Sequence, residues 1–350
     1  MEKLSLAVLE AFGLTSRRIK KEKGHYICDT NKGLVKINIS NESPKAITLQ
    51  HSIKEYLAEN GFTQTDRYIP AKTLEPYILM GRDTYIATSY SPRHRETDFD
   101  NEPEALQAFR SLAYFHTAAK IPAHINLAPG GEQSPTMVNG YHSLRPLSQV
   151  MILSMVEASP PLPELYTRQK NELTQAGKQA RRSVRLSDFD VAFIKHAPVY
   201  SEIIDNALSC LSQTNYQELY TGAIANGSLC HNHLKEENLL ASSKETRIVN
   251  FAHATIDLQL NDLACLIRRY AQKSNKSLPM GRLLETYDKI TPLPGAAADI
   301  LHPLLIFPWA FMKIVNLYYS KKRNWTPNGL LSRMDTILAQ QGAYENYVKM

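Results

Sequence analysis

The chain has 350 residues, of which 43% are hydrophobic, so it is long enough to bury one large core or two smaller ones. Its net charge of +6, from 40 basic and 34 acidic residues, is a weak excess that argues against a nucleic-acid-binding protein. Local basic clusters at 17–21, 181–185 and 321–323 are interpreted as solvated surface, with an anionic partner as the less favoured alternative.

The four cysteines form no C-x-x-C pair, which indicates a reducing compartment and no disulfide framework. The N-terminus carries an early acid and too short an apolar run for a signal peptide. No uncharged apolar run of about 18 residues occurs, so we expect no membrane span. The longest apolar stretch, Pro303–Met312, is interpreted as part of a buried core helix.

Hydrophobic patterning predicts elements along the whole chain. A short helix is expected over 1–15, followed by strands over 25–30 and 34–39 with a hairpin turn at Asn31-Lys32-Gly33. A helix over 45–59 and two strands flanking 80–83 come next, the second of them over 85–90. From Pro103 the chain is expected to be helical, with helices at 164–182, 198–212, 280–288, 295–320 and 328–349, and one capped by Asp262. The polar helix 164–182 either faces solvent or a partner, or folds over a cleft.

One segment carries most of the functional information. Residues 229–240 read Leu-Cys-His-Asn-His-Leu-Lys-Glu-Glu-Asn-Leu-Leu, followed by Ile-Val-Asn-Phe at 248–251 and Asn-Asp-Leu-Ala at 261–264. This layout resembles the H-G-D-x-x-x-x-N, [IV]-D-F and D-L-A segments of aminoglycoside and choline kinase-like phosphotransferases. In such enzymes the first Asp orients or deprotonates the acceptor hydroxyl, and the second holds Mg²⁺ against the ATP phosphates. Here His233 occupies the first position and Asn250 the second.

Further segments extend the resemblance over most of the chain. They are Gly61-Phe62, Thr84–Tyr90 leading into Asp98-Phe99-Asp100, Leu112–His116, and Phe307-Pro308 followed by Asn316, Tyr318, Tyr319 and Trp325. In this order and spacing they are similar to the CotS family of kinase-like spore coat proteins. The resemblance implies a two-lobed α+β fold, with a sheet-containing N-lobe over 1–92 and a helical C-lobe over 93–350. The catalytic-loop-like segment would span 229–264.

Several residues match positions that the resemblance implies are functional. Lys36, on the second strand, matches the lysine that pairs with the ATP phosphates. Its usual Glu partner would come from the helix at 45–59, where Glu55 and Glu59 are the candidates. Glu55 lies opposite the apolar stripe, so we expect it to point to solvent and the Lys–Glu pair to be lost. Only Gly24 and Gly33 are available for a glycine-rich phosphate loop, so any nucleotide would be covered loosely.

In the loop itself, His231 matches the bracing histidine, Asn238 the metal-binding asparagine, and Asp262 the buried acid that anchors the loop. His231 and Asp262 are expected to be structural, while Lys36 and Asn238 would form a residual nucleotide and metal site. Replacing the catalytic Asp by His233 removes a fixed negative charge, and the loss of a positioned base costs about 10²–10⁴-fold in rate. Asn250 offers only a neutral amide oxygen, which is a weak ligand for Mg²⁺.

A transition-metal site made by Cys230, His231, His233 and His253 is a competing interpretation. Neighbouring side chains on a strand-to-loop segment alternate in direction and rarely converge on one ion, so no metal site is expected. Asp257 is the only acid shortly after Asn250 and could reach inwards.

The sequence therefore predicts a spore-coat-associated pseudokinase, a structural or interaction module with other spore coat proteins as partners and no resident cofactor. It would be made without a signal peptide in the mother-cell cytoplasm. One alternative is a weakly active phosphotransferase acting on a small molecule, sugar or protein, with ATP and Mg²⁺ as cofactors. Another is a nucleotide-binding switch without catalysis, ordered through Lys36.

Overall fold

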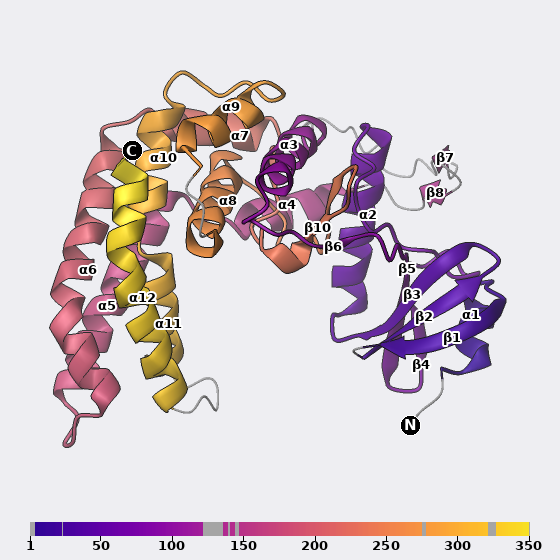
Figure 1. Cartoon of the computed structure of the whole chain (residues 1–350), viewed down its shortest axis with the longest axis horizontal. Coiled ribbons are helices and arrows are strands. Elements are labelled where there is room, and N and C mark those ends of the chain that lie inside the picture. Colours follow the sequence, from indigo (N-terminus) through magenta and orange to yellow (C-terminus); the bar gives the residue numbers. More distant parts are fainter. Residues whose placement is uncertain are drawn as a thin grey trace.

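A computed structural model of the protein describes residues 4–22, 24–121, 136–138, 141–143, 147–274, 278–320 and 327–349. An antiparallel sheet with two helices forms the N-terminal part, and the remainder is mostly helical (Figure 1). This is the two-lobed α+β architecture expected from the sequence, which is confirmed. Trp325 and the basic cluster at 321–323 lie outside the described residues.

The N-terminal sheet has the strand order β1-β2-β3-β5-β4, with all neighbours antiparallel. Its strands are β1 (Ser16–Glu22), β2 (His25–Thr30), β3 (Gly33–Ser40), β4 (Ile78–Met80) and β5 (Asp83–Ser89). Val35 and Ile37 of β3 are fully buried in a core shared with α1 (Leu6–Ala11). Because side chains alternate along a strand, Lys36 faces the opposite side, in register with Ile27 and Thr88.

Helix α2 (Pro44–Glu59) lies between the sheet and the helical lobe (Figure 1). Ser43 caps its first turn and Pro44 begins it, where a missing backbone N–H costs nothing. Ile53 and Leu57 belong to the main core of the helical lobe, so α2 joins the two parts of the molecule. Both of its faces are consequently covered.

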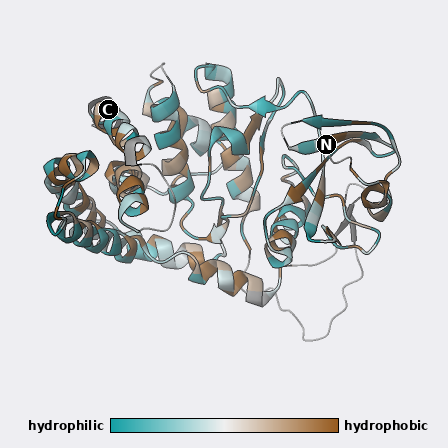
Figure 2. Ribbon diagram, turned by 90° about the horizontal axis from the view of Figure 1, so that it is seen from below, coloured by the Kyte–Doolittle hydropathy of each residue, from teal (hydrophilic) through white to brown (hydrophobic). Residues whose placement is uncertain are grey.

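The helical lobe contains ten α-helices among the described residues. They are α3 (Glu102–Ala118), α4 (Gln149–Glu157), α5 (Leu162–Arg181), α6 (Asp188–Ser212), α7 (Tyr216–Ala225), α8 (Leu260–Lys273), α9 (Met280–Asp288), α10 (Ala297–Ile306), α11 (Trp309–Tyr319) and α12 (Pro327–Lys349). Short strands and one 3₁₀ turn complete it: β6 (Arg95–Glu96), β7 (Thr136–Val138), β8 (Tyr141–Ser143), β9 (Leu229–Cys230), η1 (Glu236–Asn238), β10 (Leu239–Ala241), β11 (Thr246–Ile248) and β12 (Thr255–Ile256). The helices show both teal and brown bands in Figure 2, as expected for helices that bury one face.

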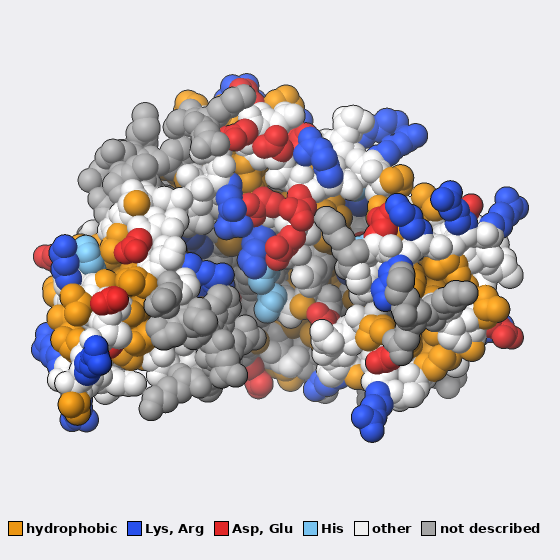
Figure 3. Space-filling model, turned by 60° about the horizontal axis from the view of Figure 1, so that its bottom comes forward, with side chains coloured by type: hydrophobic (Ala, Val, Ile, Leu, Met, Phe, Trp, Pro, Cys, Tyr) orange, Lys and Arg blue, Asp and Glu red, His pale blue; other side chains and the backbone are white. Residues whose placement is uncertain are grey.

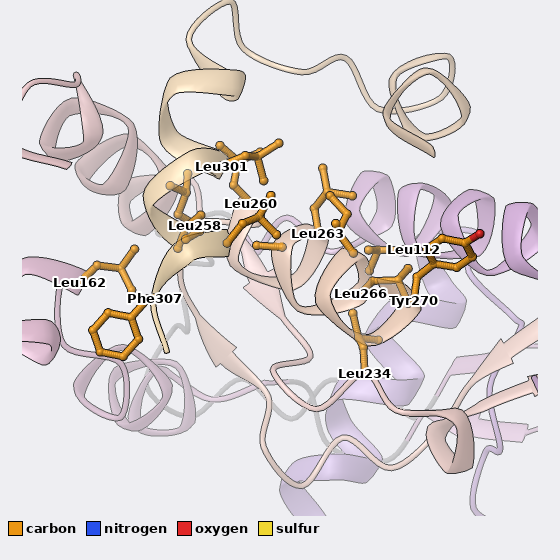
Figure 4. Packing of buried hydrophobic residues seen from close by; sticks show 14 of the residues in the cluster. Leu112, Leu162, Leu234, Leu258, Leu260, Leu263, Leu266, Tyr270, Leu301 and Phe307 are labelled. Atoms are coloured by element: carbon orange, nitrogen blue, oxygen red, sulfur yellow. The ribbon is translucent and has the colours of Figure 1, made fainter. Parts of the chain in front are cut away.

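Helix α8 is the centre of the main core. Leu263, Leu266 and Tyr270 point from α8 toward Leu112 of α3 and Leu234 of the loop that follows β9 (Figure 4). All five side chains are at most 1% exposed. Since burying a leucine contributes about 1.5–3 kcal/mol, this packing fixes the position of the loop relative to α8.

Several predicted elements differ in extent from those found. The first helix covers only Leu6–Ala11, because residues 16–22 form the edge strand β1, which the sequence analysis missed. The predicted helix over 198–212 begins earlier, at Asp188, where Ser187 and Asp190 form a capping box. Helix α5 (Leu162–Arg181) corresponds to the predicted helix 164–182, and it buries one stripe against α6 and α11 while its polar side chains face outwards.

The predicted helix over 295–320 is two helices, α10 and α11. Phe307 adopts an extended conformation with φ −59° and ψ 128°, as a residue before proline usually does, and Pro308 then starts α11. By length and apolarity alone the 23-residue stretch Ala297–Tyr319 could cross a membrane, but 56% of its apolar 18-residue window is buried inside the protein. We therefore treat it as core.

Gly227 has the most constrained position of the described glycines. Its φ is +57°, and a Cβ built on it would lie 1.7 Å from the backbone oxygen of Ile121. We expect Gly227→Ala to lower the free energy of unfolding by about 1–3 kcal/mol in urea denaturation, because the backbone must move. Gly222→Ala in α7, where a Cβ meets nothing within 4 Å, is the matched control and should be neutral or slightly stabilising. Equal effects of the two substitutions would contradict this account.

Candidate functional site

The loop after β9 is held by a single buried carboxylate. Asp262, in the first turn of α8, accepts hydrogen bonds from the backbone N–H groups of His231 (2.6 Å) and Asn232 (2.7 Å). Asn232 takes the place of the motif glycine and has φ +58°, a left-handed conformation that asparagine tolerates better than most residues. The expectation that Asp262 caps its own helix is wrong, since Gln259 is at the N-cap and the carboxylate binds the loop instead.

Behind Asp262 lies a buried chain of polar groups. Its Oδ2 lies 3.2 Å from Nε2 of His116, whose Nδ1 is 2.6 Å from the hydroxyl of Tyr287. Burial by itself would raise the pKa of Asp262, but the hydrogen bonds and charges of His116 and His231 outweigh it and lower the pKa. The carboxylate is therefore ionised and fixes the loop conformation from α8.

His231 is fully buried and orders the loop from the other side. Its Nε2 lies 2.9 Å from the carbonyl oxygen of Val249, and its Nδ1 accepts the backbone N–H of His233 at 3.2 Å. The two contacts together require a neutral ring with the proton on Nε2. Desolvation lowers the pKa of His231, in keeping with a neutral ring. Its geometry is that of a structural brace.

His233 occupies the position of the missing catalytic acid. Its ring is half-buried and stacks on His253, with ring centroids 4.5 Å apart. Desolvation first, and then the charges of Lys235 and the neighbouring histidines, lower the pKa of His233 to about 4. At neutral pH the ring is uncharged, so it cannot supply the fixed negative charge of an aspartate.

Asn238 and Asn250 form a closed pair where the motif places two metal ligands. Asn238 donates from Nδ2 to the carbonyl oxygen of His233 at 2.8 Å, which leaves its Oδ1 facing Asn250. Asn250, at φ +65°, donates its Nδ2 to that oxygen at 3.2 Å. Because one amide already donates to the other, the pair offers no two converging oxygens to a cation. The donor set does not fit Mg²⁺, which prefers hard and anionic oxygen ligands.

Lys36 and Glu55 are not partners. Glu55 is only 2% exposed and is bound by two nitrogens of Arg67, Nε at 3.0 Å and Nη2. The expectation that Glu55 points to solvent is therefore wrong, because α2 is covered on both faces. Among the described residues no carboxylate lies within ion-pair distance of Lys36, whose half-buried side chain faces away from the core that the sheet shares with α1.

The two glutamates inside the loop are also paired. Glu236 accepts from Arg269 at 2.6 Å and lies 3.4 Å from Lys273, and both cations come from α8. Glu237 lies 3.5 Å from Lys235. Acidic and basic side chains gather in this way at the middle of the face shown in Figure 3, next to histidine side chains. Neither glutamate is placed to replace the missing acids.

A pocket of about 640 Å³ opens beside His233. Its walls come mainly from α4, α5, α8 and the loops around 232 and 252–257, with single residues from α2, α10 and α11. They include Asp257 but neither Lys36 nor Asn238. The Oδ2 atom of Asp257 accepts the hydroxyl of Ser159, and Oδ1 accepts the N–H of Leu258 at 2.6 Å. Asp257 thus reaches inwards, to the pocket rather than to the asparagine pair.

Three further residues of this pocket were missed by the sequence analysis: Ser159, Arg168 and Arg268. They come from segments far apart in the chain, and no local motif marks them. Of the residues in the alternative metal site, Cys230 points its Sγ to the carbonyl oxygen of Asp257 at 3.4 Å, and the described residues contain no group of three or more His, Cys, Asp or Glu side chains that could hold a metal ion.

The buried carboxyl of Asp257 should leave a signature in stability. Desolvation raises its pKa to about 6, so its ionised form disfavours folding. The protonated form of Asp257 therefore makes a stabilising contribution relative to the ionised form. This contribution is complete below about pH 4, the ordinary pKa of an aspartate, and is lost as the pH rises through about 6. We expect Asp257→Asn, which keeps an acceptor for Leu258, to be more stable than wild type at pH 7 by on the order of 2 kcal/mol.

The measurement is urea denaturation of both proteins at several pH values. Because the lowered pKa of His233 acts in the opposite sense between about pH 4 and 6.5, the difference between the two curves is the relevant quantity. A constant difference from pH 4 to 7 would contradict the raised pKa.

Comparison with known proteins agrees with this fold. An aminoglycoside phosphotransferase from Alicyclobacillus acidocaldarius superposes with a TM-score of 0.76 at 16% identity, covering 100% of this chain and 95% of that one. An AMP-bound spectinomycin phosphotransferase gives 0.66 at 12% identity, covering 97% and 95%. A microcompartment-associated aminopropanol kinase gives 0.53 at 10% identity, covering 96% and 93%. At these identities the likeness shows the fold alone, and the kinase-like fold expected from the sequence is confirmed.

The matches in sequence cover a smaller part of the chain than the matches in structure. The endospore coat-associated protein YutH of Bacillus subtilis is 27% identical over 165 residues, so the match spans 46% of this chain and 46% of that protein. The family described as "Spore coat putative kinase YutH" matches residues 163–350, more than half of the chain. The expectation of a kinase-like spore coat protein is thus confirmed. The chain belongs to the YutH family of kinase-like spore coat proteins.

Proposed function

We propose that this protein is a pseudokinase of the spore coat, acting as a structural or interaction module during coat assembly. The observation that carries the proposal is the hydrogen bond from Asn250 to Asn238. Two neutral amides thus lie where the related motif has one acid and one amide, both directed at a metal ion. The fold is stabilised there without a cation, and the chemistry that the cation would supply is missing.

Other features support the same conclusion. The neutral His233 replaces the acid that positions the acceptor hydroxyl, and such a loss costs about 10²–10⁴-fold in rate. Lys36 has no carboxylate partner among the described residues, because Glu55 is bound to Arg67. The residues that hold the loop in shape, His231 and Asp262, are both hydrogen-bonded to its backbone. Architecture is therefore retained while the transfer machinery is not.

The proposal also includes where the protein is located, which partners it has and where its two lobes divide. The named relative is endospore coat-associated, which supports placement of this chain in the coat with other coat proteins as partners. Synthesis in the mother-cell cytoplasm fits that placement. We place the lobe boundary at residues 92 and 93, since the sheet ends at Ser89 and β6 already pairs with β10 of the helical lobe.

Two alternatives each have an observation in their favour. A weakly active phosphotransferase on a small molecule, sugar or protein is favoured by the pocket beside His233, whose ring is unprotonated at pH 7 and can accept a proton. It would use ATP with Mg²⁺. A nucleotide switch without catalysis is favoured by Lys36, whose ammonium group has no carboxylate partner among the described residues and lies on the face of the sheet opposite the α1 core.

Turnover of ATP separates the proposal from the first alternative. We expect wild type with Mg²⁺ or Mn²⁺ to release phosphate from ATP no faster than Lys36→Ala, because neither the base nor the metal ligand is present. The positive control is a phosphotransferase of the same fold assayed in parallel. Metal-dependent turnover in wild type that is lost in both Lys36→Ala and His233→Ala would overturn the pseudokinase proposal.

A further inference from the structure

The pocket beside His233 has an unusual charge balance. Among its lining residues two are arginines, Arg168 of α5 and Arg268 of α8, and one is an acid, Asp257. The two histidines in its wall, His233 and His253, can only be neutral or positively charged, so Asp257 is the one acidic side chain among the lining residues. The pocket lies in a fold shared with enzymes that are named for aminoglycosides, which are polycations.

Neither arginine has a counter-ion within the described ranges. Arg168 is exposed on α5 and makes no ion pair or hydrogen bond with another described residue. Arg268 is half-buried and donates from Nη1 to the carbonyl oxygen of Leu304 at 2.6 Å, a contact that leaves its charge uncompensated. Most buried or half-buried cations in proteins have an anionic partner, and this one lacks a carboxylate within reach.

The single acid does not offset both of these charges. Both carboxylate oxygens of Asp257 already accept hydrogen bonds, from the Ser159 hydroxyl and the Leu258 N–H. The side chain is only 5% exposed, and among the described residues it forms no ion pair with either arginine, so at most one of the two positive charges is offset. The guanidinium groups keep free N–H donors, and these favour carboxylate or phosphate oxygens in fork geometry.

From this arrangement we infer that the pocket beside His233 binds a small organic anion, a carboxylate or phosphate ester, held by Arg168 and Arg268. A volume of about 640 Å³ suits a ligand of metabolite size. Trp309, which lies in the wall with Arg268, offers an aromatic surface to the rest of the ligand, and a second cavity of about 280 Å³ shares both residues. The inference deepens the proposed function, because it gives the interaction module a ligand class at the degenerate site.

The test uses the full-length protein and a panel of probes. Binding of citrate, glucose 6-phosphate, glucose and kanamycin is measured by calorimetry at low ionic strength and by NMR of methyl groups. We expect citrate or glucose 6-phosphate to bind at least tenfold more tightly than both glucose, which lacks the charge, and kanamycin, which carries the opposite charge. Citrate and glucose 6-phosphate separate a carboxylate preference from a phosphate preference.

Two variants locate the binding site. Arg168→Gln, at an exposed side chain with no ion pair or hydrogen bond to another described residue, should weaken anion binding about 3- to 10-fold with an unchanged melting temperature. Arg181→Gln is the matched control, since it makes the same change on the same helix outside the pocket lining, and it should leave binding unchanged. Arg268→Gln is expected to act more strongly than Arg168→Gln, with its fold checked by circular dichroism.

Each outcome decides the inference separately from the proposed function. If kanamycin or glucose binds as tightly as the anions, or if Arg168→Gln and Arg181→Gln act alike, the anion site is wrong while the pseudokinase proposal stands. If an anion binds and is phosphorylated by ATP, the anion site stands and the pseudokinase proposal falls.

Discussion

Replacing Asp262 by asparagine is expected to lower the free energy of unfolding by about 3–5 kcal/mol, which is the cost of breaking a buried charged network. Asp262 is fully buried and is approached by three N–H groups, from His231, Asn232 and His116. An asparagine side chain has one oxygen for these three donors and turns its own N–H groups toward at least one of them. Unsatisfied buried donors cost about 1–3 kcal/mol each.

The measurement is urea denaturation at pH 7, with Asp335→Asn as the control. Asp335 is exposed on α12, and its substitution should change stability by less than about 0.5 kcal/mol. The lowered pKa of Asp262 means that its contribution is present above about pH 4 and is lost below it, so wild type and variant should converge in acid. A loss below about 1 kcal/mol at pH 7 would show that the loop is not anchored from α8.

The second large effect is expected at Arg67. Substitution by methionine leaves Glu55 buried at 2% exposure without its bidentate partner, and breaking such a pair typically costs about 3–5 kcal/mol. Burial already raises the pKa of Glu55 in wild type, against the opposing charge of Arg67. In Arg67→Met the carboxyl should therefore protonate near neutral pH, and part of the lost stability should return as the pH falls to about 5.

A double variant tests the origin of this loss. Glu55→Leu combined with Arg67→Met removes both charges and should recover most of the stability, since paired hydrophobic replacements of buried ion pairs are often neutral. Lys20→Met on the exposed edge strand β1 is the control for removal of a surface cation, with an expected change within about 0.5 kcal/mol. If the double variant is as unstable as Arg67→Met, the loss arises from packing of the arginine stem and not from the unpaired acid.

The sequence predicted the loop of the site well, because a motif constrains neighbouring residues. His231, His233, Asn238, Asn250 and Asp262 all lie in or against one segment, and their spacing already implied proximity. The spacing of these residues in the sequence could not predict the hydrogen bond between Asn238 and Asn250. That contact depends on a left-handed backbone at Asn250 and on the carbonyl of His233, which only the folded loop brings together.

The errors in the N-lobe have a different cause. Helical-wheel reasoning placed Glu55 in solvent because it assumed that α2 buries a single face, whereas this helix is packed between the sheet and the helical lobe. Strand β1 was missed because its residues are exposed on both faces as the sheet edge, so it lacks the alternation that marks a strand. Arg168 and Arg268 were missed because they are far apart in the chain and only the folded structure brings both to the wall of one pocket.

The central claim is that the amide pair of Asn238 and Asn250 has replaced a metal site. Calorimetric titration of ATP into wild type and Asn250→Asp, with and without Mg²⁺, tests this most directly. We predict that Mg²⁺ leaves the affinity of wild type for ATP unchanged within about threefold, while Asn250→Asp gains a metal-dependent increase of at least tenfold from its anionic ligand. A metal-dependent increase of tenfold or more in wild type, lost in Lys36→Ala, would contradict the account.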